Sequence, residues 1–192
     1  GMNGGQYQAI EFCGEAVQAL SMQERMTLSN MSAEMGALAA LMQIDCPERE
    51  AALDRFHARH GHEHLLVDKW LMLNAQCQGG DAAARIERLT RHPDFKWTTP
   101  NKVYSLISGF VGGNPAGFNA EDGSGYKVIA DAILKLDPMN PQVASRLATG
   151  FRSCKLLNSS RKSAAQAELE RILAEPTLSR DVYEIVSKIA RS

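Results

Sequence analysis

The sequence has few of the features that assign a function directly. Its 192 residues contain no apolar run approaching the roughly 18–20 residues that span a bilayer, which argues against a membrane protein. Only 6% of the residues are aromatic. The four cysteines stand at least 31 residues apart, without CxxC or zinc-finger spacing. These absences argue against a secreted disulfide scaffold and predict reduced thiols in a cytoplasmic protein.

The sequence also lacks a large excess of either positive or negative charge. The net charge of −1 provides no overall attraction to nucleic acid or membrane, so neither is expected as a partner. Residues 1–96 carry 9 basic and 13 acidic side chains, whereas residues 97–192 carry 12 and 9. Residues 138–167 contain five basic side chains and no acidic one. This stretch is either a solvated basic face or a wall that attracts an anionic ligand.

The N-terminus lacks the basic and apolar stretches of a secretory signal. Gly1 before Met2 is typical of the scar that tag cleavage leaves. We find no composition change typical of a flexible linker, and therefore treat residues 1–192 as one domain.

Helical periodicity dominates what is present. Val103, Leu106, Ile107 and Phe110 follow the i, i+3, i+4, i+7 pattern of one helix face, and period-two alternation is absent. The start signals Thr99-Pro100 and Asn140-Pro141, and Ser159 or Ser160, agree with helices. The expected helices are 6–20, 30–43, 47–60, 63–77, 81–91, 100–111, 124–136, 141–157, 160–174 and 178–190. Short loops between them predict an all-α fold of stacked antiparallel hairpins, a solenoid-like superhelix of the HEAT/armadillo type.

The histidines are the first candidates for chemistry. A zincin helix requires His-Glu-x-x-His, but His62-Glu63 is followed by Leu66 where the second histidine should stand. His57 and His60 lie three residues apart, and no acidic third ligand is evident for them. We therefore interpret His57, His60, His62 and His64 as an exposed helix end and assign no metal to the chain. The alternative is that the chain is a small metal-dependent enzyme that uses these histidines.

Other catalytic patterns are absent too. No serine lies in GxSxG, and Gly123-Ser124-Gly125 lacks the third glycine and the preceding strand of a dinucleotide-binding loop. We assign no catalytic residue and no cofactor to this chain.

The segment 140–147 is more informative. In a helix that starts at Asn140-Pro141, Val143 and Leu147 share an apolar face, and Gln142 and Arg146 share the adjoining stripe. An amide and a guanidinium on one stripe suit the recognition of peptide carbonyls and carboxylates. A solvated polar stripe is the alternative.

Two long runs carry a family resemblance: NPAGFNAEDGSGY at 114–126 and NPQVASRL at 140–147. Shorter matching runs lie at 30–32, 46–49, 67–70, 105–107 and 181–184. Together they resemble the C-terminal domain of bacterial aminopeptidase N, in order, over about residues 28–192. Residues 1–27 match this pattern only weakly.

The resemblance implies a function that the chain performs only within a larger enzyme. The family consists of zinc-dependent aminopeptidases whose upstream catalytic domain carries His-Glu-x-x-His and Gly-x-Met-Glu-Asn, neither of which is present here. Their helical C-terminal domain encloses the active-site chamber and limits access to small peptides. Gln142 matches a position lining the pocket for the first substrate side chain, and Arg146 an arginine facing the channel. Tyr104 stands where some relatives have a basic residue.

We therefore expect zinc in the parent enzyme and none in this chain, which alone would have no turnover. Its partners would be the upstream catalytic domain and small peptides. The alternative is a free-standing helical-repeat module that binds a partner helix or peptide.

Overall fold

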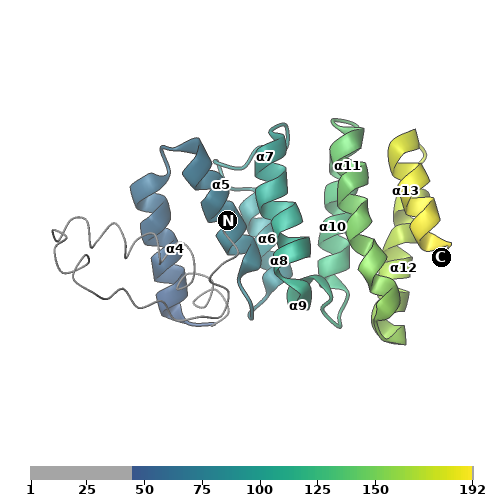
Figure 1. Cartoon of the computed structure of the whole chain (residues 1–192), viewed down its shortest axis with the longest axis horizontal. Coiled ribbons are helices and arrows are strands. Elements are labelled where there is room, and N and C mark those ends of the chain that lie inside the picture. The colour runs from purple at the N-terminus through teal and green to yellow at the C-terminus, as the bar shows by residue number, and fades with distance from the viewer. Residues whose placement is uncertain (1–44, 192) are drawn as a thin grey trace, which may run out of the picture.

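The structure is a computed structural model, and it describes residues 45–191 (Figure 1). Within that range every regular element is a helix. The α-helices are α4 (Pro47–His60), α5 (His64–Gln76), α6 (Ala82–Thr90), α7 (Pro100–Val103), α8 (Gly109–Gly113), α9 (Pro115–Phe118), α10 (Ser124–Leu136), α11 (Pro141–Ala148), α12 (Ser159–Leu173) and α13 (Arg180–Ala190). A π-helical segment, η2 (Tyr104–Ser108), joins α7 to α8, and a 3₁₀ segment, η3 (Thr149–Leu156), extends α11. The expected helices 6–20 and 30–43 lie outside the described residues.

The helices form two layers that run along the long axis of the molecule (Figure 1). In one layer α6 contacts α10, and α10 contacts α12. In the other layer α5 packs against η2 and α8, and α11 packs against α13. Antiparallel pairs such as α10–α11 and α12–α13 connect the layers. This stack of hairpins confirms the predicted all-α, solenoid-like architecture.

Apolar side chains between the layers make one continuous core. At its centre the rings of Phe118, Phe110, Tyr126 and Phe151 lie with centroids 5.3–6.4 Å apart, most of them edge to face. All four are at most 1% exposed. Aromatic pairs favour such edge-to-face or offset arrangements over face-to-face sandwiches, so these contacts stabilise the packing of successive hairpins.

The predicted helix boundaries are mostly confirmed, but two of the predicted caps differ in detail. Asn140 caps α11 by accepting a hydrogen bond from Val143 N at 3.2 Å, as predicted. Thr99 stands at the N-cap of α7 but makes no side-chain cap bond. Asn158, not Ser159 or Ser160, caps α12, through Arg161 N at 3.0 Å.

Two predicted helices are not uniform. The expected helix 100–111 contains the π segment and runs on to residue 113, and α9 follows it where no helix was expected. The expected helix 141–157 tightens to 3₁₀ geometry after Ala148. Thr149 Oγ1 donates to Arg146 O at 2.7 Å, a side-chain bond that competes with the backbone ladder. Among residues 45–191, no helix is long and apolar enough to cross a membrane.

A groove between η2–α8 and α11–η3

A groove opens between two segments that are far apart in the sequence. It has a volume of about 390 Å³ and lies between the π segment with α8 on one side and α11 with the 3₁₀ segment on the other. The residues lining it are Tyr104, Ser108, Val111, Gly112, Arg146, Leu147, Thr149 and Gly150. None of these lining residues is acidic, so the one full charge on the groove wall is that of Arg146.

Local sequence explains how α11 presents its polar stripe. Pro141 and the Asn140 cap fix the start of the helix, so the register of each later side chain is set. Val143 is 5% exposed and Leu147 is 3% exposed, which confirms the predicted apolar face. Gln142 and Arg146 are both exposed, one turn apart. Of the two, Arg146 lines the groove and Gln142 lies outside the lining.

The opposite wall begins at Tyr104, the first residue of the π segment. The Arg146 guanidinium carbon lies 5.6 Å from the centroid of the Tyr104 ring, which is within the range of a cation–π contact. A π segment widens one turn of a helix, and such segments are frequent at functional sites. Helical periodicity alone could not have located it, because the residues still fit an α-helical pattern.

The floor of the groove depends on a close approach of α8 and η3. A Cβ atom at Gly150 would lie 2.6 Å from Val111 Cγ1, so only glycine lets these segments meet without a shift. Sequence reasoning missed Ser108, Gly112 and Thr149 because nothing in their local pattern marks them. They become neighbours of Arg146 only through tertiary packing.

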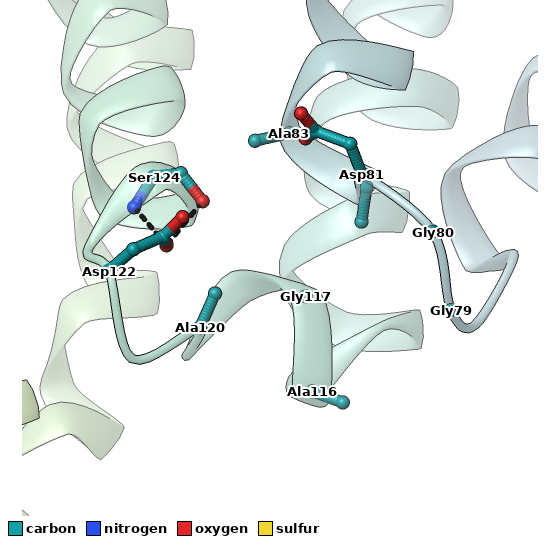
Figure 2. A pocket seen from close by; sticks show the side chains of 10 residues that line it. Gly79, Gly80, Asp81, Ala83, Ala116, Gly117, Ala120, Asp122 and Ser124 are labelled. Atoms are coloured by element: carbon teal, nitrogen blue, oxygen red, sulfur yellow. Dashed lines mark hydrogen bonds between the residues drawn. The ribbon is translucent and has the colours of Figure 1, made fainter.

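A second hollow of about 450 Å³ lies at the starts of α6, α9 and α10 (Figure 2). Its two carboxylates serve local turns. Asp81 accepts a hydrogen bond from Ala84 N at 2.9 Å and so caps α6. Asp122 accepts from Ser124 N and Oγ, bonds that hold the pKa of Asp122 below its ordinary value. These bonds account for both acidic groups, and we assign the hollow no ligand.

The histidines are arranged differently from the prediction. His62 and His64 are exposed, as expected for a helix end. His57 is not: its side chain is 27% exposed, and its Nε2 lies 2.7 Å from Asp94 Oδ2. His92, 35 positions further along the sequence, lies beside His57 with ring centroids 5.2 Å apart. Burial lowers the pKa of His92. The prediction that no acidic group accompanies these histidines is wrong, because Asp94 follows His92 by two residues and faces His57.

Comparison with known proteins agrees with this architecture. The family described as "Domain of unknown function (DUF3458_C) ARM repeats" matches residues 9–191. The chain is 38% identical over 159 residues to aminopeptidase N of Caulobacter vibrioides and 34% identical over 160 residues to that of Escherichia coli. Each alignment covers 83% of this chain and 18% of the relative. The chain thus spans less than a fifth of the length of these relatives.

A solved structure shows the same fold in a longer chain. The structure described as Legionella pneumophila aminopeptidase A in complex with aspartic acid superposes with a TM-score of 0.75 and 31% identity. The superposition covers 88% of this chain and 20% of that chain.

The two-layer stack of helical hairpins thus defines an ARM-repeat domain. The chain belongs to the family matched over residues 9–191, and it corresponds to the C-terminal helical domain of aminopeptidase N. The family match also includes residues 9–27, where the resemblance in the sequence was weakest.

Proposed function

We propose that this chain is the lid of a bacterial, cytoplasmic zinc aminopeptidase, and that it contributes a wall of the peptide chamber without supplying the reacting groups. The short coverage of the relatives supports a domain that works as part of a longer chain. The sequence holds no His-Glu-x-x-His, so we route no catalytic step through this chain and place the zinc on the upstream domain. Among residues 45–191, Cys46, Cys77 and Cys154 form no disulfide bridge with one another, which fits a reducing compartment.

One observation carries the proposal: Arg146 stands over Tyr104 on the wall of a groove whose lining holds no acidic group. A guanidinium can donate two parallel hydrogen bonds to a carboxylate, and a stacked ring restricts its orientation. A short peptide bound with its carboxyl end at this wall would therefore be favoured over longer ones. Gln142, one turn earlier on the same stripe, would contact the first substrate side chain, as the family resemblance suggests.

The test uses the parent enzyme. Arg146→Ala is expected to lower kcat/KM for dipeptides and tripeptides about tenfold or more, the value of one lost charge-assisted hydrogen bond. Gln142→Ala should change the preference for the first residue. Zinc content should stay unchanged in both variants, because neither residue is placed at the metal.

Arg152→Ala is the matched control. Arg152 is an exposed arginine of η3 that does not line the groove, and its loss removes the same charge from the same basic stretch. Equal effects of Arg146→Ala and Arg152→Ala, or loss of zinc from Arg146→Ala, would contradict the role given to Arg146.

The alternative, a free-standing helical-repeat module, is separated from the lid by size. An immunoblot of source-cell extract against this chain should show a band several times larger than 21.0 kDa. A band near that mass would support the free-standing module, and its function would then be tested by binding assays instead of peptidase assays.

A further inference from the structure

Two imidazoles and one carboxylate converge where α4, the first helix that the structure describes, packs near the end of α6. Figure 1 shows the positions of these helices. His57 Nε2 lies 2.7 Å from Asp94 Oδ2, and His92 Nδ1 lies 3.7 Å from the same oxygen. The ligand atoms of the three residues all lie within 4.8 Å of one another. Among the residues the structure describes, no other group of three or more such side chains comes this close.

The three residues come from two segments of the chain, and the buried ring of Trp70 packs against both histidines. His57 is in the last turn of α4, whereas His92 and Asp94 are in the turn that follows α6. Trp70 of α5, 6% exposed, packs against both imidazoles, with centroids 4.3 Å from His57 and 5.0 Å from His92. The two histidines are 35 positions apart in the sequence, so only the packing of α4, α5 and α6 brings them together.

The donor set fits a borderline transition metal. Two imidazole nitrogens and one carboxylate oxygen form a ligand set that Zn²⁺ accepts, with a fourth position left for water. The side chains of His57, His92 and Asp94 are 27%, 31% and 34% exposed, so solvent reaches that position.

The spacing is close to what such a site needs. Bonds of about 2.0–2.1 Å in a tetrahedron place neighbouring ligand atoms about 3.3 Å apart. The distances of 2.7 and 3.7 Å lie on either side of that value. A widest separation of up to 4.8 Å requires a shift of up to about 1.5 Å, which side-chain rotation at His92 can supply. At present His92 Nδ1 accepts a hydrogen bond from Asp94 N at 3.2 Å, so either this bond opens or Nε2 of His92 binds instead.

We propose that His57, His92 and Asp94 form a site that binds Zn²⁺. The bound ion would link the end of α4 to the turn after α6. On binding, the metal takes the Nε2 lone pair of His57, and the Nε2 proton moves through solvent to Nδ1, so the imidazole stays neutral. Asp94 exchanges its hydrogen bond from His57 for a bond to the metal. The proposal is independent of the role given to the groove.

The experiment is equilibrium dialysis of the chain, free of any histidine tag, against ZnCl₂ in chelator-treated buffer. The expected result is one bound Zn²⁺ per chain. At a free concentration of about 100 times Kd, Zn²⁺ should raise Tm by about 5–10 °C, since the ligand binds only the folded state.

Matched variants distinguish Zn²⁺ binding at this site from adventitious Zn²⁺ binding by the exposed histidines. His92→Gln and Asp94→Asn should weaken Zn²⁺ binding about tenfold or more. The double variant His62→Gln/His64→Gln should bind as the unsubstituted chain does. Binding that is lost in the double variant, or kept in both His92→Gln and Asp94→Asn, would overturn the proposal, as would an unsubstituted chain that binds no stoichiometric zinc.

A second measurement covers the case in which a ligand variant fails to fold. Co²⁺ added to the chain carrying Trp97→Phe should give the strong visible bands of a four-coordinate site. It should also quench the remaining tryptophan, Trp70, which contacts both histidines. If one equivalent of Co²⁺ produces neither signal, the cluster is a hydrogen-bonded clip without metal.

Discussion

The Arg146 guanidinium of α11 stands over the ring of Tyr104, 5.6 Å from its centroid, across the groove between the two segments. The sequence predicted that Arg146 is polar and exposed. It did not predict that Tyr104 is the residue that Arg146 contacts. The contact between the two side chains fixes the position of the Arg146 guanidinium, which is the single positive charge on the groove wall.

This contact yields the first prediction, made for the parent enzyme. Tyr104→Leu removes the ring and should lower kcat/KM for short peptides about two- to fivefold, as expected for loss of an exposed cation–π contact. Tyr104→Phe keeps the ring and should retain most of the activity. An equal loss in both variants would assign the effect to the hydroxyl and not to the ring.

The second prediction concerns pH and the ion pairs between α4 and α6. Both carboxylate oxygens of Glu50 accept from Arg85, at 2.5 and 2.9 Å, and Arg49 adds a bond at 3.0 Å. The hydrogen bond from Arg85 is the main cause that holds the pKa of Glu50 below its ordinary value of 4.5. The unfolded chain therefore binds a proton at Glu50 at a higher pH than the folded chain does. The resulting stabilisation is present above about pH 4.5 and is lost as the pH falls through the lower folded pKa.

Glu50→Gln tests this relationship. The Glu50 side chain is 42% exposed, so solvent screening limits the expected loss of unfolding free energy to about 1 kcal/mol near pH 7. Urea unfolding of both chains should show this difference shrinking as the pH falls from 7 to below about 4.5, because Glu50 then becomes protonated in the unfolded chain first and in the folded chain at a lower pH. A difference that does not change between these pH values would mean that the charge on Glu50 contributes nothing.

The third prediction rests on the contact of α10 with α9. A Cβ atom at Gly125 would collide with the carbonyl oxygens of Gly117 and Phe118, which are backbone atoms that cannot rotate away. Gly125→Ala should therefore lower the unfolding free energy by about 1–3 kcal/mol or more.

Gly112→Ala is the control for this prediction. A Cβ at Gly112 in α8 meets nothing within 4 Å. Because alanine favours a helix interior over glycine, this variant should gain about 0.5–1 kcal/mol. Opposite signs for the two substitutions in urea unfolding would check the close approach directly; a neutral Gly125→Ala would refute it.

The fourth prediction concerns Asn114, whose side chain is needed twice. Its Oδ1 accepts from Gly117 N at 2.9 Å and caps α9, and its Nδ2 donates to Cys77 O at 2.6 Å. Asn114 is 1% exposed, so Asn114→Ala removes both the cap of α9 and a buried hydrogen bond to Cys77 O. The expected cost is about 2–4 kcal/mol of unfolding free energy, measured by urea titration.

Asn158→Ala separates the two contributions. Asn158 caps α12 in the same way, through Arg161 N at 3.0 Å, but it is exposed. Its removal should cost only about 1 kcal/mol. Equal costs for the two asparagines would indicate that the bond to Cys77 O adds nothing to the cap.

Local rules of helix formation explain why most of the fold could be predicted. Apolar spacing identified the helix at 124–136, and Asn140-Pro141 marked the start of α11 to the residue. The same register placed Val143 inward and Arg146 outward before any tertiary contact was known. These features depend on residues within a few turns of one another, so a linear pattern contains them.

The π segment at 104–108, the tightening after Ala148 and the short helix α9 escaped prediction. In each case the local pattern is compatible with an ordinary helix or loop. Contacts with distant segments accompany the last two: Asn114, the cap of α9, donates to Cys77 O, and Gly150 of the 3₁₀ segment approaches Val111.

By itself, the sequence determined the all-α class, the order of the hairpins and the exposure of Gln142 and Arg146, because periodicity and capping act locally. Only the tertiary structure decided that Arg146 meets Tyr104 and that His57 meets His92 and Asp94. Those pairs are 42 and at least 35 positions apart, and the packing of whole helices against one another, not any local preference, sets their distance.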